Sequence, residues 1–164
     1  MDEFPEIPSN ALIVVAGKRM SGKTEFLRVI RDAWQSDDIT EVSDVKELES
    51  STEGMCICDD SCIPRGYNPG RLFADDHTGC HVLVLQYLDL PPRKPDRPTI
   101  LCVPCTIDNT REGRERTVSR AKSWFGVDLQ AVDDEPYTYH VICEDADGYA
   151  KVRRTKAQYP SLDQ

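Results

Sequence analysis

Short runs of apolar residues alternate with polar segments along much of the chain. The runs at 11–16, 55–58, 81–85 and 99–103 are rich in β-branched residues and cysteine. Continuous apolar runs of this length are typical of strands that are buried on both faces of a parallel sheet. The pattern therefore predicts a mainly parallel central sheet.

Amphipathic helices are expected to flank this sheet. Residues 24–34 place apolar side chains at helical spacing, and so do residues 109–125, which Gly126 follows as a stop signal. Strands that alternate with helices in this way predict an α/β fold. The weaker elements are a strand at 38–45 and helical turns at 45–51 and 71–76.

The two ends of the chain have their own patterns. Residues 137–144 and 149–153 alternate between apolar and polar positions around an Asp-Gly turn, which predicts a β-hairpin that closes the sheet. Prolines and acidic residues in 1–10 indicate an extended, peripheral arm. We expect an arm at 1–10 followed by a single domain at 11–164.

Charge and cysteine content narrow the functional classes. The net charge of -9 disfavours tight nucleic-acid binding by an isolated subunit, because such binding depends on Lys and Arg neutralising phosphates. The seven cysteines lack the spacing of a secreted disulfide framework, and no leader peptide or membrane-spanning run is evident. We expect a protein of a reducing compartment that is not secreted.

The cysteines allow two interpretations. Cys102 and Cys105 have the spacing of metal ligands, and Cys56, Cys58 and Cys62 lie close together. Most of these cysteines fall on or beside predicted buried strands, where free thiols behave as small hydrophobic side chains. We favour core packing over a zinc site.

A phosphate-binding loop is the strongest chemical signal. It follows the first apolar run and precedes the first amphipathic helix, which is the order of strand, loop and helix that a P-loop requires. Its amides can surround phosphates, Lys23 can reach the β and γ phosphates, and the Thr24 hydroxyl can ligate Mg²⁺. The motif is Gly17-Lys18-Arg19-Met20-Ser21-Gly22-Lys23-Thr24.

Two later strands end in polar residues that suit nucleotide hydrolysis. Asp59 and Asp60 follow the second apolar run, and Gln86 follows the third. We expect Asp59 to hold Mg²⁺, Asp60 to activate or orient water, and Gln86 to sense the γ-phosphate. The alternative for the acidic pair is a structural cap at the start of a loop.

Two groups of basic residues could meet phosphate. Arg93 and Arg97 lie in a proline-rich loop after the sensor strand, where one of them could act as an arginine finger on a neighbouring subunit. The second group lies on the predicted 109–125 helix, where it could contact DNA or form a solvated face balanced by acids. Its members are Arg111, Arg114, Arg116, Arg120 and Lys122.

In this order, the P-loop, the Asp59-Asp60 pair, Gln86-Tyr87 and Leu90-Pro91-Pro92 resemble the poxvirus-type genome-packaging ATPases of large DNA viruses, in the FtsK/HerA superfamily. The resemblance implies a RecA-like core of the additional-strand type, with the sensor strand between the P-loop strand and the acidic strand. It also implies a homo-oligomeric ring that uses ATP and Mg²⁺ to pump double-stranded DNA into a capsid, with a capsid or portal vertex as a further partner. The expected locations are the host cytoplasm or nucleus and the virion.

Three functions remain open on these residues. The leading hypothesis is a Mg²⁺-dependent ATPase that drives viral DNA packaging. The second is a small P-loop nucleoside or nucleotide kinase, in which Asp60 would act on an acceptor hydroxyl. The third is a non-catalytic ATP-binding scaffold protein.

Overall fold

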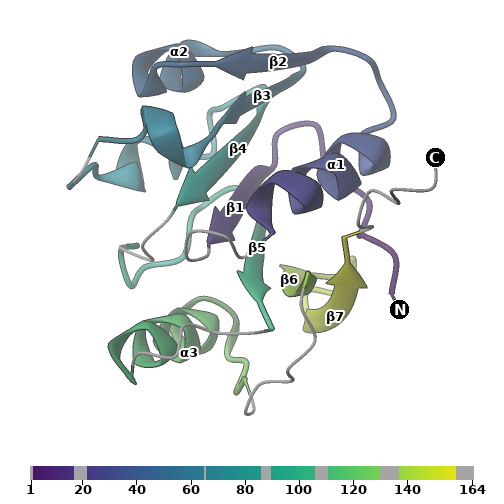
Figure 1. Cartoon of the computed structure of the whole chain (residues 1–164), viewed down its shortest axis with the longest axis vertical. Coiled ribbons are helices and arrows are strands. Elements are labelled where there is room, and N and C mark those ends of the chain that lie inside the picture. The colour runs from purple at the N-terminus through teal and green to yellow at the C-terminus, as the bar shows by residue number, and fades with distance from the viewer. Residues whose placement is uncertain are drawn as a thin grey trace.

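The structure is a computed structural model, and it describes residues 2–16, 22–64, 66–85, 90–105, 111–129 and 137–157. Strands and helices alternate through most of this range (Figure 1). The elements are β1 (Leu12–Ala16), α1 (Lys23–Ala33), β2 (Ile39–Val42), α2 (Val45–Ser50), β3 (Met55–Cys58), the 3₁₀ turns η1 (Asp60–Cys62) and η2 (Pro69–Leu72), β4 (Cys80–Leu85), β5 (Thr99–Pro104), α3 (Arg111–Phe125), β6 (Thr138–Glu144) and β7 (Ala150–Lys156).

The seven strands form one mixed sheet in the order β2-β3-β4-β1-β5-β6-β7. The first five strands in this order pair in parallel, whereas β6 and β7 are antiparallel to their neighbours. The α/β class, the mainly parallel sheet and the C-terminal hairpin are therefore confirmed. The order also places β4 between β1 and β3, which is the position that the motif resemblance implies for the strand preceding Gln86.

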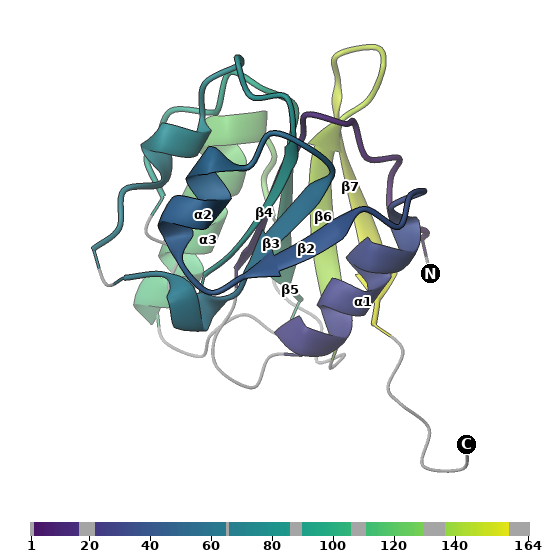
Figure 2. The ribbon, with the colours of Figure 1, turned by 90° about the horizontal axis from the view of Figure 1, so that it is seen from above.

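Helices cover both faces of the sheet, and alternate residues of β1 face opposite ways to meet them. Leu12 and Val14 belong to a core shared with α2 and α3, whereas Ile13 and Val15 belong to a core shared with α1. In Figure 2, α2 and α3 lie on one side of the strands and α1 lies on the other. Burial on both faces explains why the central strands have continuous apolar runs.

All five parallel strands end at the same edge of the sheet, which we call the carboxyl edge. The hairpin extends this edge because β6 runs the opposite way and starts there. The Cys105 amide donates to the Thr138 carbonyl at 2.8 Å, and the Ala157 amide donates to the Tyr137 carbonyl at 2.8 Å. Tyr137 therefore lies at the carboxyl edge, beyond β5.

The N-terminal arm is extended, as predicted, but it packs onto the domain. The Phe4 ring contacts the Phe26 ring of α1 edge-on, with 6.0 Å between centroids. Asp2 exchanges two hydrogen bonds with Arg154 of β7, one from each backbone amide. These contacts cover part of α1 and of the edge strand, so the arm is less peripheral than its composition indicates.

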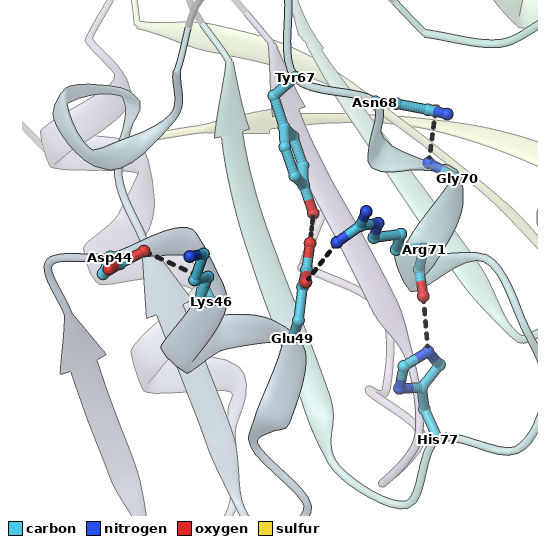
Figure 3. A network of polar contacts seen from close by, with 8 residues as sticks. All are labelled: Asp44, Lys46, Glu49, Tyr67, Asn68, Gly70, Arg71 and His77. Carbon is cyan, nitrogen blue, oxygen red and sulfur yellow. Dashed lines mark hydrogen bonds and ion pairs between the residues drawn. The ribbon is translucent and has the colours of Figure 1, made fainter.

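A polar network holds the segment between β3 and β4 against α2 (Figure 3). The Tyr67 hydroxyl donates to Glu49 at 2.5 Å, and Arg71 lies 3.7 Å from the other carboxylate oxygen of Glu49. Burial, and secondarily the Glu49 carboxylate, raise the pKa of Tyr67. The network connects α2 to η2 through one half-buried carboxylate.

The helical turn predicted at 71–76 is shifted toward the N-terminus, because η2 spans Pro69–Leu72. The Asn68 side chain accepts a hydrogen bond from the Gly70 amide at 3.0 Å, which caps this turn, and Pro69 fits its first position. A Pro-Gly pair that indicates a loop in the sequence thus begins a 3₁₀ turn here.

Candidate functional site

The last three residues of the phosphate-binding motif lie at the carboxyl edge, where α1 begins. Gly22 is the N-cap residue of α1 and has a left-handed backbone with φ of +87°. Lys23 starts the helix with a largely buried side chain, and Thr24 follows with an exposed one. The other predicted loop residues, 17–21, lie outside the described residues.

The described start of α1 has the general properties of an anion site. The N-cap residue Gly22 makes no side-chain cap hydrogen bond. The helix dipole favours negative charge at this end. The sequence motif and this helix start are therefore compatible with phosphate.

Asp59 lies at the same edge, directly after β3. Its exposed side chain accepts a hydrogen bond from the Ser61 amide at 2.8 Å and a second from the Ser61 hydroxyl, both to Oδ1. The predicted cap is thus present, and it leaves Oδ2 of Asp59 without a protein donor among the described residues. The capping and metal-binding interpretations are compatible, because each uses a different oxygen.

Asp60 begins η1, one residue beyond Asp59, and its side chain is not among those the structure describes. The roles of water-activating acid for Asp60 and of sensor for Gln86 therefore remain predictions. Gln86 lies outside the described residues, immediately after Leu85 at the end of β4.

A disulfide closes the turn that carries the acidic pair. It joins Cys58, the last residue of β3, to Cys62, the last residue of η1. Asp59 and Asp60 lie between the two cysteines. The sequence led us to expect no disulfide-based architecture, and this bond is a local link within one turn rather than a framework between elements.

The sheet register places β3 and β1 at comparable heights on either side of β4. Ala16 pairs with Leu85, and Cys58 pairs with Leu83. Two strand spacings separate β1 from β3, which amounts to roughly 10 Å.

The donor set fits Mg²⁺. This ion keeps several waters and binds through one or two carboxylates together with substrate phosphates. The exposed Thr24 hydroxyl and the Asp59 carboxylate, both at this edge, are oxygen donors of the kind that such an ion would use. These are the residues that would hold the ion.

Arg97 lies at the opposite, amino edge of the sheet. Its side chain is 2% exposed, and its guanidinium donates to the carbonyls of Asn10, Leu72, Ala11 and Gly79 at 2.8–3.1 Å. A buried guanidinium with these acceptors cannot reach a neighbouring subunit. The prediction that Arg97 acts as an arginine finger is therefore not carried further.

Arg97 also determines the tautomer and the pKa of a buried histidine. Its guanidinium lies 2.9 Å from Nδ1 of His81, and Nε2 of His81 lies 2.9 Å from the Ser51 carbonyl. Nε2 therefore carries the proton and Nδ1 accepts from Arg97. Burial, followed by the Arg97 charge, lowers the pKa of His81 to about 4.

Arg93 is exposed, unlike Arg97, and its guanidinium pairs with Asp96 at 3.0 Å. It precedes Lys94, which pairs with Glu144 at the end of β6. That end lies at the amino edge, so Arg93 is remote from Lys23 of its own chain. The structure leaves Arg93 accessible to a second subunit.

The cysteines that the sequence offers as metal ligands are dispersed. Cys56, Cys102 and Cys105 are buried free thiols, and burial raises the pKa of Cys102. Within the described residues, no three His, Cys, Asp or Glu side chains gather as a metal site. None of the helices described here is long and apolar enough to cross a membrane.

Tyr137 is a component of this edge that the sequence pattern does not reveal. Its ring packs on Gly22, such that a Cβ at Gly22 would lie 2.5 Å from Cδ1 of the ring. The two residues are far apart in sequence, and the pairing of β5 with β6 brings them together. An alternating strand pattern predicts the hairpin but does not indicate what its first residue contacts.

Comparisons with known proteins identify no relative of this chain. No protein-family model matches the chain, and neither the curated proteins nor the solved structures contain a match.

Proposed function

We propose that this chain is a Mg²⁺-dependent ATPase whose site lies at the carboxyl edge of the sheet. The observation that carries the proposal is that Lys23 and Thr24, at the start of α1, lie at the same edge of the sheet as Asp59, which follows β3. The strand between them, β4, leads directly to Gln86. One edge thus carries a cation, a hydroxyl and a carboxylate.

Each residue has a role in phosphoryl transfer. The loop amides and Lys23 bind the β and γ phosphates and neutralise charge that develops in the transition state. Thr24 and Asp59 hold Mg²⁺, which neutralises charge on the phosphates when it is bound. Asp60 orients or deprotonates the attacking water, and Gln86 contacts the γ-phosphate.

We further propose that hydrolysis powers the packaging of double-stranded viral DNA. The support is the order β2-β3-β4-β1-β5, which matches the additional-strand RecA-like core implied by the motif resemblance. A net charge of -9 argues that a single subunit binds DNA weakly. DNA binding therefore depends on a homo-oligomeric ring, in which Arg93 is the remaining candidate for a finger acting on a neighbour.

The test is steady-state phosphate release from ATP with Mg²⁺, with and without double-stranded DNA. Lys23→Ala and Asp60→Asn are expected to lower the rate at least about a hundredfold, the scale seen when one transition-state contact is removed. Lys156→Ala and Asp147→Asn remove the same side chains from exposed positions and serve as matched controls.

The outcomes distinguish the candidate functions. DNA-stimulated release that depends on Lys23 and Asp60 supports the packaging ATPase. Release that DNA does not change supports an ATPase with another role. Transfer of phosphate to a nucleoside in place of water would indicate the kinase, and ATP binding without turnover would indicate the scaffold.

A further inference from the structure

The Tyr137 ring lies directly beside the start of α1. It contacts Gly22 so closely that the three ring atoms Cδ1, Cε1 and Cγ would all lie within 3.5 Å of a Cβ at that position. Tyr137 is partly buried and packs against the core that includes Phe26. An aromatic residue thus lies next to the predicted phosphate-binding motif with part of its surface exposed.

The backbone of Tyr137 is held in an uncommon conformation. Among the described residues, Tyr137 is the one non-glycine residue with positive φ, at +62°. This region is unfavourable for a bulky side chain, and it persists only when the surroundings impose it. Here the Tyr137 carbonyl accepts from the Ala157 amide and the next residue, Thr138, accepts from Cys105, which fixes the ring at the edge.

The order of strands gives the bound nucleotide a direction. Asp59 lies after β3, on one side of the P-loop strand β1, whereas Tyr137 lies before β6, on the other side. In the site proposed above, the γ-phosphate and Mg²⁺ lie toward Asp59. The phosphate chain then leads the nucleoside away from Asp59, toward β5 and β6.

We propose that Tyr137 forms one wall of the nucleobase subsite and provides a stacking surface for the base. This inference rests on the proposed function, because it takes its orientation from the Mg²⁺-bound phosphates. Stacking on an aromatic ring tolerates every base, since each base has a π-face. Tyr137 therefore contributes affinity for nucleotides in general and does not select adenine over guanine.

The experiment compares two ligands that share phosphates but differ in the base. Dissociation constants for ADP and for inorganic tripolyphosphate are measured with Mg²⁺ on the full chain and on Tyr137 variants. Tyr137→Phe keeps the ring and Tyr137→Ala removes it. Tyr137→Gly also removes the ring but accepts positive φ, which keeps the test usable if the alanine variant folds poorly. Tyr149→Ala is the matched control, because Tyr149 is 76% exposed in the distant hairpin turn.

The expected result is a selective loss of the affinity that the nucleobase contributes to nucleotide binding. Tyr137→Ala and Tyr137→Gly weaken ADP and GDP binding by about 5-fold to 100-fold, the scale of one stacked base. Tripolyphosphate binding, and the values for Tyr137→Phe and Tyr149→Ala, stay within about 2-fold of the unmodified chain, well below that scale.

Two results would overturn the inference while leaving the proposed function intact. One is equal weakening of ADP and tripolyphosphate, which would show that Tyr137 only supports the P-loop by packing on Gly22. The other is unchanged ADP binding in both ring-free variants. If the unmodified chain binds neither ligand, the proposed function itself fails.

Discussion

Oδ1 of Asp59 accepts hydrogen bonds from both the amide and the hydroxyl of Ser61. Two donors on one oxygen restrict the orientation of the carboxylate. Ser61 therefore acts on the candidate metal site through Asp59, and the disulfide between Cys58 and Cys62 closes the same turn.

Ser61→Ala removes the hydroxyl donor and keeps the amide donor. Because a net hydrogen bond contributes about 0.5–1.5 kcal/mol, we expect the Mg²⁺ concentration for half-maximal phosphate release to rise by about 2-fold to 10-fold. A Mg²⁺ titration at saturating ATP measures this shift. Ser50→Ala is the control, since the Ser50 hydroxyl donates to the Glu47 carbonyl within α2. Equal curves for the two variants would contradict the positioning role.

Arg97→Ala should strongly destabilise the fold. The substitution leaves buried carbonyls at the amino edge without their donor and opens a cavity, so we expect a loss of about 3 kcal/mol or more in the free energy of unfolding. Arg93→Ala removes an exposed side chain that pairs with Asp96, and should change stability by less than about 0.5 kcal/mol. Urea denaturation measures both, and similar losses would contradict the contrast between the two arginines.

Protonation of His81 should lower stability in acid. Burial and the Arg97 charge lower its folded-state pKa to about 4, below the ordinary 6.5, so the unfolded chain binds more protons between these values. The contribution of neutral His81 to the free energy of unfolding is fully present above about pH 6.5. It decreases as the pH falls toward 4, by on the order of 3 kcal/mol in total.

His81→Gln keeps a donor for the Ser51 carbonyl but cannot take up this proton. The free energy of unfolding of the variant, measured by urea denaturation between pH 7 and pH 4, should therefore depend less steeply on pH. Some dependence of the free energy of unfolding on pH will remain, because burial also lowers the pKa of His140, which likewise reduces stability in acid. An unchanged slope in the variant would show that His81 is not the group responsible.

Gly22→Ala tests the contact between Gly22, the N-cap residue of α1, and Tyr137. The added Cβ would lie 2.5 Å from Cδ1 of the ring, and the alanine would have to adopt φ of +87°. Gly126→Ala is the control, because Gly126 has φ of +68° with open space around it. We expect Gly22→Ala to lower the free energy of unfolding by about 1–3 kcal/mol more than the control, the usual penalty of overpacking. Equal losses would mean that the ring moves away freely.

The sequence predicts the sheet well because its central strands are buried on both faces. A strand such as β1 must be apolar at every position, and that produces a pattern which can be recognised without an alignment. The sequence also predicts the two helices, because apolar residues recur at helical spacing in each. Gly126 ends α3 and has φ of +68°.

The contacts between distant residues are what the pattern could not predict. Arg97 has the same residue type and loop context as Arg93, and only the folded chain shows that backbone carbonyls surround one and solvent surrounds the other. Tyr137 reaches Gly22 through strand pairing, which leaves no local signal. The bond between Cys58 and Cys62 likewise depends on the turn that η1 makes after β3.

The most direct test of the account asks whether the ends of β1 and β3 form one site. Equilibrium binding of a non-hydrolysable ATP analogue is measured with and without Mg²⁺ for the unmodified chain, Lys23→Ala and Asp59→Asn. We predict that Mg²⁺ strengthens binding to the unmodified chain by about tenfold or more, equivalent to about 1.4 kcal/mol. Asp59→Asn should lose this enhancement, and Lys23→Ala should bind weakly under both conditions. If Mg²⁺ strengthens binding equally with and without the Asp59 carboxylate, the two strand ends do not share a metal-nucleotide site, and the proposed function is wrong in its central feature.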